Sequence, residues 1–178
     1  MEKYLFLNPA DVISADNYPN CDRFLYANKK TLENLIRIVE ETQCKIVIIS
    51  DASNQLNSRG GDWTKVLNSQ WLQLGYPSQI SFFSATPVLW VADLKGLAYP
   101  VKSWKKQCED SKDGIQVALW LGLNADNDDK YVIINRSQEN KFLKNQKSQI
   151  VVCESTGLSD AQAQQVISML NSEKDERT

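Results

Sequence analysis

The chain of 178 residues contains no histidine, and this absence excludes several reaction mechanisms. Ser-His-Asp and Cys-His catalysis need an imidazole base, as do the many nucleases that use a histidine base. Carboxylate chemistry, lysine chemistry and binding without chemistry remain open. Cysteines are few and far apart, and because they form no CxxC pair the sequence indicates no zinc site. They are Cys21, Cys44, Cys108 and Cys153.

Long hydrophobic runs and a strong excess of one charge are also missing. No stretch approaches the length of a membrane span, and the apolar run near the N-terminus is too short for a secretion signal. We therefore expect a cytoplasmic protein with reduced cysteines, in which Cys44 and Cys153 are small core residues. The net charge of -2 argues against non-specific nucleic-acid binding, because such binding requires a basic face.

Apolar, β-branched segments alternate with helical patterns along the chain. This alternation predicts a three-layer α/β/α architecture with a mainly parallel, Rossmann-like sheet. We expect one domain over residues 1–172, a small inserted segment at 85–110, and a charged tail at 173–178. The expected strands are 4–8, 45–50, 80–84, 131–135 and 149–154, and the expected helices are 31–42, 63–74, 112–122 and 157–170.

Polar residues follow three of these strands directly. Parallel sheets place their sites at the carboxyl ends of the strands, so these residues are the first candidates for function. The three groups are Asn8 to Asp11, Ser50 to Ser53, and Asn135 to Ser137.

The order of these features resembles the haloacid dehalogenase (HAD) superfamily, in particular the small HAD domain of RNA-repair-type proteins. "YLFLNPADVI" stands where the family has a strand followed by Asp-x-Asp-Gly-Val, and "CKIVIISDAS" stands where a second strand ends in serines. "KYVIINRS" is similar to the strand before the paired aspartates. "VVCESTGLSDAQAQQVISML" is similar to the closing strand, Gly-Leu and helix. The resemblance covers residues 3–171 and implies an HAD-like fold.

The same resemblance implies that the catalytic groups have been replaced. In the family one aspartate attacks phosphorus, a second protonates the leaving group, and a later acidic pair helps to hold Mg²⁺. Asn8 stands at the nucleophile position and Ala10 at the acid position. Asn135 and Arg136 stand in place of the acidic pair. The resemblance therefore implies a pseudo-phosphatase with no catalytic residue and no cofactor.

Other residues leave alternatives open. The resemblance keeps Ser50 at the phosphate-binding position and assigns Lys112 to the cation that neutralises the phosphoryl group. Asp11 and Asp51 would be a nucleophile and a metal ligand if the alignment were shifted by one residue; as turn and capping residues they need no such role. These residues support two alternatives, a divergent Mg²⁺-dependent HAD phosphatase and a phosphate- or nucleotide-binding sensor.

The inserted segment carries Trp90 and Trp104, which would anchor a partner protein or pin the segment to the domain. Our main hypothesis is a catalytically inactive HAD-like protein that acts through protein–protein binding in a bacterial or phage cytoplasm. One concrete version is an immunity or antitoxin-type protein that neutralises a basic toxin, since a mildly acidic inhibitor would associate with it quickly. We expect neither nucleic acid nor membrane as a partner.

Overall fold

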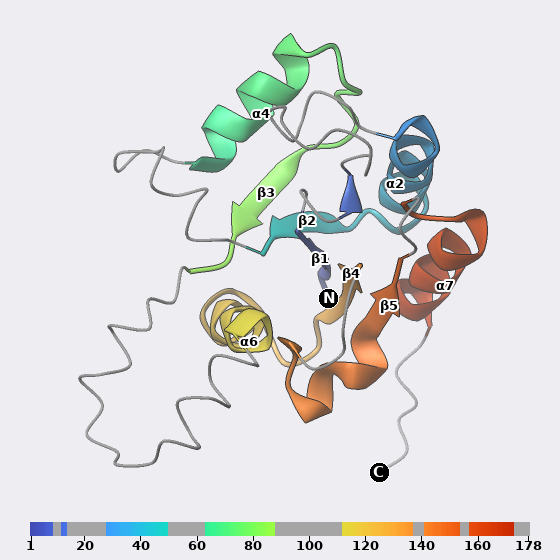
Figure 1. Ribbon diagram of the computed structural model, residues 1–178. Coiled ribbons are helices and arrows are strands. Elements are labelled where there is room, and N and C mark those ends of the chain that lie inside the picture. Colours follow the sequence, from blue (N-terminus) through green and yellow to red (C-terminus); the bar gives the residue numbers. More distant parts are fainter. Residues whose placement is uncertain are drawn as a thin grey trace.

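The computed structural model describes residues 1–8, 12–13, 28–49, 63–87, 112–136, 141–153 and 157–172 (Figure 1). Its helices and strands alternate in the order that the sequence predicts. In chain order they are β1 (Lys3–Leu7), α2 (Lys29–Thr42), β2 (Lys45–Ile48), α4 (Trp63–Gln73), β3 (Phe82–Ala85), α6 (Lys112–Asn124), β4 (Lys130–Asn135), the 3₁₀ helix η3 (Lys144–Gln149), β5 (Ile150–Val152) and α7 (Asp160–Asn171).

The strands form one five-stranded sheet in the order β3-β2-β1-β4-β5, and every pair in it is parallel. The predicted α/β fold class is therefore confirmed. The chain moves outward from β1 through β2 to β3, and then returns to the other side of β1 as β4 and β5. The strand order thus reverses between β1 and β4, which is the point at which open α/β sheets bind their ligands.

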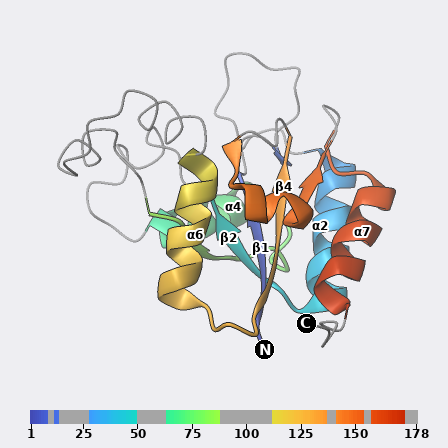
Figure 2. The same cartoon turned by 90° about the horizontal axis from the view of Figure 1, so that it is seen from below.

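Helices cover both faces of the sheet (Figure 2). Leu5 and Leu7 of β1 belong to the core beneath α2 and α7, whereas Tyr4 and Phe6 belong to the core beneath α6. Successive side chains of a strand point to opposite faces, so a strand that is covered on both faces is apolar at every position. This double burial explains the continuous apolar runs from which the central strands were predicted.

Side-chain caps fix the starts of α2 and α7. The Oδ1 atom of Asn28 accepts hydrogen bonds from the backbone amides of Lys30 and Thr31. Ser159 and Gln162 form the capping box that the sequence predicts for α7. The predicted inward face of this helix is buried, and its members are Ala163, Val166, Ile167 and Leu170.

The two edge strands differ from their predicted bounds. β3 begins at Phe82 rather than residue 80, because Ile80 lies in a turn where its amide donates to the carbonyl of Pro77. The side-chain amide of Asn68 then binds both backbone groups of Phe82, at 2.9 and 3.0 Å. β5 begins one residue late because η3 extends to Gln149. The long-range contact of Asn68 thus fixes the start of β3, whereas the directly preceding η3 sets the start of β5.

Two of the four cysteines lie in the described part of the chain, and both are buried free thiols, as predicted. Burial raises the pKa of the Cys44 thiol. Cys21 and Cys108 lie outside the described residues. None of the helices in the described ranges is both long enough and apolar enough to cross a membrane.

Candidate functional site at the carboxyl edge of the sheet

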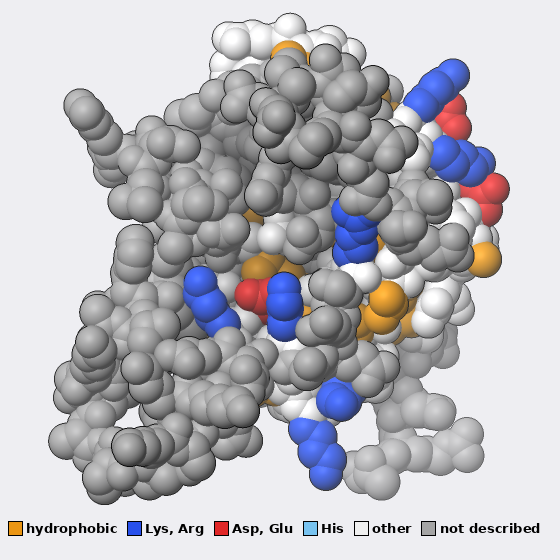
Figure 3. All heavy atoms as spheres, viewed as in Figure 1, with side chains coloured by type: hydrophobic (Ala, Val, Ile, Leu, Met, Phe, Trp, Pro, Cys, Tyr) orange, Lys and Arg blue, Asp and Glu red, His pale blue; other side chains and the backbone are white. Residues whose placement is uncertain are grey.

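The candidate site lies where β1 and β4 end side by side. Leu7, the last residue of β1, is paired with Ile134, so Asn8 and Asn135 occupy the next position on these neighbouring strands. This is the point where the strand order reverses. Figure 3 looks onto this edge of the sheet. The structure thus brings together two of the residues that the sequence analysis selected.

Asn135 is a buried polar residue at the end of β4, with 3% of its surface exposed. Its backbone carbonyl accepts a hydrogen bond from the amide of Cys153, at 2.9 Å. Strand alternation places Asn135 on the same face as Ile133, the face that α6 covers. A neutral amide is tolerated at such a position, whereas a buried carboxylate would need a cation or several hydrogen-bond donors.

The chain after β1 is anchored at both ends. The carbonyl of Asn8 accepts from the amide of Val12, at 3.0 Å, and the carbonyl of Ile13 accepts from the amide of Asn28, at 3.1 Å. Val12 and Ile13 are buried in the core beneath α2 and α7. The turn is therefore held to the core on one side and to the cap of α2 on the other. Ala10 and Asp11, between these anchors, lie outside the described residues.

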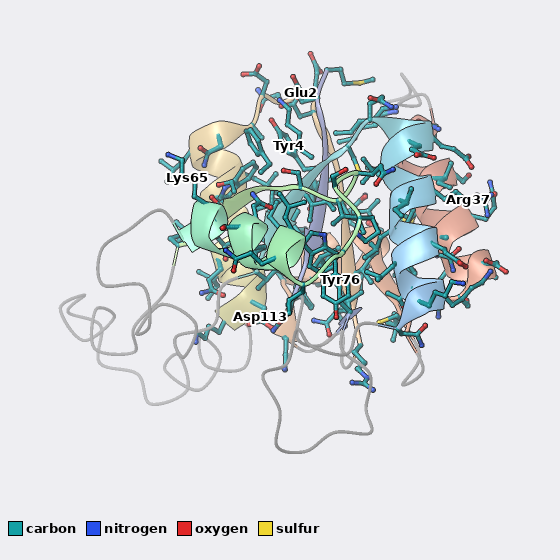
Figure 4. The ribbon with its side chains drawn as sticks, turned by 90° about the horizontal axis from the view of Figure 1, so that it is seen from above. Glu2, Tyr4, Arg37, Lys65, Tyr76 and Asp113 are labelled. Carbon is teal, nitrogen blue, oxygen red and sulfur yellow. The ribbon has the colours of Figure 1, made fainter. Side chains whose placement is uncertain are left out.

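Lys112 is the first residue of α6 and reaches the same edge. α6 runs opposite to the strands, so its first turn lies at their carboxyl ends. Figure 4 shows this arrangement, with Asp113 at the opposite end of the domain from Glu2. Lys112 and Asp113 are both half-buried. Arg136, which follows β4, is also half-buried, so the described part of this edge holds two cationic side chains, Lys112 and Arg136, and one acidic side chain, Asp113.

Gln146 holds the start of α6 in place, and the sequence analysis missed it. Its side chain is buried, donates to the carbonyl of Gly114 at 2.9 Å, and accepts from the amide of Leu143 at 3.0 Å. Gly114 permits this contact, because a Cβ atom there would lie 2.7 Å from the Cα atom of Phe142. The sequence did show a glycine early in the predicted helix 112–122, which is a sign of a close contact. Nothing in the polar stretch "KNQKSQ" showed that Gln146 is the residue that makes this contact.

Five of the predicted site residues lie outside the described residues: Asp11, Ser50, Asp51, Trp90 and Trp104. The same holds for most of the predicted inserted segment, since residues 88–111 are not described. Their assigned roles therefore stay predictions.

Within the described ranges, no group of three Cys, Asp or Glu side chains is arranged to hold a metal ion. Comparison with known proteins finds no match among family models, curated sequences or solved structures. The chain thus has the parallel α/β arrangement common to Rossmann-like and HAD-like folds, without a family assignment.

Proposed function

We propose that the chain is a non-catalytic, HAD-like binding protein whose carboxyl edge receives a partner protein. The observation that carries this proposal is the pair of amides, Asn8 and Asn135, at the two strand ends where the strand order reverses. A carboxamide donates and accepts hydrogen bonds, but it is not the carboxylate nucleophile that phosphoryl transfer to an aspartate requires. The position suits recognition better than turnover.

The residues described at this edge do not fit a magnesium ion. Mg²⁺ in phosphoryl-transfer sites is held by one or two carboxylates together with substrate phosphates. Asn8 and Asn135 offer neutral oxygens, Asp113 is the one carboxylate described there, and Arg136 and Lys112 add positive charge that repels a cation. A magnesium-dependent phosphatase would therefore need Asp11 or Asp51 as its nucleophile or as a further metal ligand.

The nature of the partner is a further part of this proposal. An immunity or antitoxin-type role agrees with the small size and mild acidity of the chain. However, Lys112, Arg136 and Lys141 outnumber Asp113 among the described residues of this edge, which opposes a basic toxin there. A basic toxin would have to contact other parts of the protein, such as the segment that carries Trp90 and Trp104.

The cations Lys112 and Arg136 favour one second candidate, a phosphate- or nucleotide-binding sensor. In this version Lys112 neutralises the anion, and Ser50 supplies hydrogen bonds at the end of β2. Such a protein would bind phosphate without hydrolysing an ester, because it needs no nucleophile.

Calorimetric titration of the purified protein with Mg²⁺ and, separately, with inorganic phosphate separates these functions. The enzyme needs both ligands, the sensor needs phosphate, and the protein-binding function needs neither. We expect no heat of binding from either titration. Phosphate binding that Ser50→Ala abolishes would favour the sensor over the proposed protein-binding function. Binding of Mg²⁺ would contradict the proposed protein-binding function.

A further inference from the structure

We propose that Asn68 guards the outer edge of β3 against strand addition by a second copy of the chain. β3 is the last strand on its side of the described sheet, and β2 is the one strand paired with it there. An edge strand presents backbone groups that can pair with another chain. This inference concerns a different part of the sheet from the candidate site, so it holds or fails independently of the proposed function.

The side chain of Asn68 occupies the place of a neighbouring strand. Its Oδ1 atom accepts from the backbone amide of Phe82 at 2.9 Å, and its Nδ2 atom donates to the carbonyl of Phe82 at 3.0 Å. Two opposed residues of an antiparallel sheet exchange the same pair of bonds. Asn68 belongs to α4, which lies alongside β3 (Figure 1). A strand from a second copy can therefore pair with Phe82 only where Asn68 is displaced.

The sequence around β3 has the composition of a segment that associates readily. Residues 80–86, "ISFFSAT", contain no charged residue, no proline and no glycine, and two of them are phenylalanines. Segments of this length and composition form intermolecular β-structure when they are exposed at an edge. Phe83 is 52% exposed. The segment lacks the charges and prolines that blunt many edge strands, so its protection has to come from residues outside it.

Two further features disfavour pairing at this edge. The register of β3 against β2 shifts at Phe83, which is an extra residue between paired positions. Such a bulge increases the local twist of an edge strand. The ammonium group of Lys45 lies 4.9 Å from the ring centroid of Phe83 and 3.0 Å from the carboxylate of Glu2, so an ion pair stands beside the exposed ring. Neither feature occupies the backbone groups of Phe82, and this role belongs to Asn68.

The opposite edge of the sheet is bound in a similar way. β5 has three residues, and the carbonyl of its last residue, Val152, accepts from the Nε2 atom of Gln162 at 2.8 Å. Gln162 is held in turn by the capping box at the start of α7. A side-chain amide from a helix thus binds the backbone of each edge strand. This recurrence supports a protective role for the amide of Asn68.

Sedimentation velocity over a range of protein concentrations tests the inference. Asn68→Ala opens the backbone of Phe82, and we expect its self-association to be about 10-fold tighter than that of the wild type, since an opposed pair of Phe82 residues exchanges two hydrogen bonds. The matched control is Asn34→Ala, which removes a side-chain hydrogen bond to the carbonyl of Leu158 and opens no sheet edge. It should sediment like the wild type. Asn68→Ala/Phe83→Glu places a charge at the edge and should restore wild-type sedimentation.

Three results of this experiment would overturn the proposal: wild-type association of Asn68→Ala, equal association of Asn34→Ala, or association that Phe83→Glu does not reverse. Circular dichroism of each variant separates strand pairing from loss of folding. Asn68→Ser, whose shorter side chain cannot bind both backbone groups, replaces the alanine variant if the latter is unfolded.

Hydrogen exchange of the wild-type protein tests the same contact without a substitution. The amide of Phe82 should exchange slowly, like the amides inside β1 and β2, although β3 lies at the edge of the sheet. Fast exchange of this amide would also overturn the proposal, because Asn68 would then not hold it.

Discussion

The two faces of the sheet are built differently. On one face α2 and α7 contact each other, and Leu158 joins them: its amide donates to the hydroxyl of Thr31 at 3.0 Å and its carbonyl accepts from Asn34 at 2.8 Å. The other face relies on α6 and an aromatic cluster. There the ring of Trp120 lies 4.9 Å from that of Tyr4 in an edge-to-face arrangement.

This difference separates the scaffold from the surface that we assign to binding. Asn135 lies on the α6 face by strand alternation, and Lys112 begins α6 itself. Gln146 ties residues 143–146 to the same helix. Helices α2, α7 and α4 pack on the first face, whereas on the second face the position of α6 decides where Lys112 and the first turn of α6 stand. The following changes test that division, from the largest expected effect to the smallest.

Trp120→Ala should give the largest loss of stability. The indole is buried, packs against Tyr4 and Phe6, and donates from Nε1 to the hydroxyl of Ser84 at 3.0 Å. Truncation leaves a cavity beneath α6, so we expect the free energy of unfolding to fall by about 3–5 kcal/mol. Urea titration measures it. Trp120→Phe should lose clearly less, and a loss under about 1 kcal/mol in Trp120→Ala would contradict the importance given to this residue.

Gly157→Ala tests the face formed by α2 and α7. Gly157 has φ +105°, and a Cβ atom there would collide with the side chain of Thr31. Strain and overpacking together should lower the free energy of unfolding by about 2–4 kcal/mol. Gly75→Ala is the matched control, since φ is +76° but no atom lies within 4 Å of the added Cβ. It should lose about 1 kcal/mol; equal losses would mean that the contact with Thr31 contributes nothing.

Two glycines of α6 provide an internal comparison. At Gly114 a Cβ atom would lie 2.6 Å from both Gln146 Oε1 and the amide of Leu143, so Gly114→Ala should cost about 1–2 kcal/mol net. At Gly122 nothing lies within 4 Å, and Gly122→Ala should stabilise the protein by about 0.5–1 kcal/mol. Thermal unfolding of both variants checks the signs. Stabilisation by both changes would refute the close contact between α6 and residues 142–146.

Asp160→Asn should have the smallest effect, and it should depend on pH. A hydrogen bond from the Lys30 ammonium lowers the pKa of Asp160 below its usual 3.8. A depressed pKa gives stability that is present above the unfolded-state pKa and is lost as pH falls through the folded-state value. The variant should therefore be slightly less stable than wild type near neutral pH, and the two should converge in acid. A difference that stays constant with pH would rule out this pair as its cause.

The sequence predicted the central strands well because their physics is local. A strand buried on both faces is apolar at every position, so β1, β2 and β4 could be located from runs such as "KIVI". From their ends it followed that Asn8 and Asn135 would stand at the same edge. The start of α2 was placed two residues late because Asn28, its cap, precedes the apolar pattern.

The features that escaped prediction depend on contacts between distant residues. Asn68 sets the start of β3 through hydrogen bonds to the backbone of Phe82. The hydrophobic pattern of the sequence does not predict this contact. The hydrogen bond between Gln146 and Gly114 joins the polar stretch 144–149 to α6. The stretch alone has the composition of a solvent-exposed loop, so its sequence does not predict this bond.

The most direct test of the central claim is the rate of Mg²⁺-dependent hydrolysis of an aryl phosphate, measured beside an Asp11→Asn variant. If the strand ends serve binding alone, both proteins should release product no faster than a blank that contains Mg²⁺. Turnover by the wild-type protein that disappears in the variant would contradict the account. In that case Asp11 would be the nucleophile, and the chain would be an enzyme.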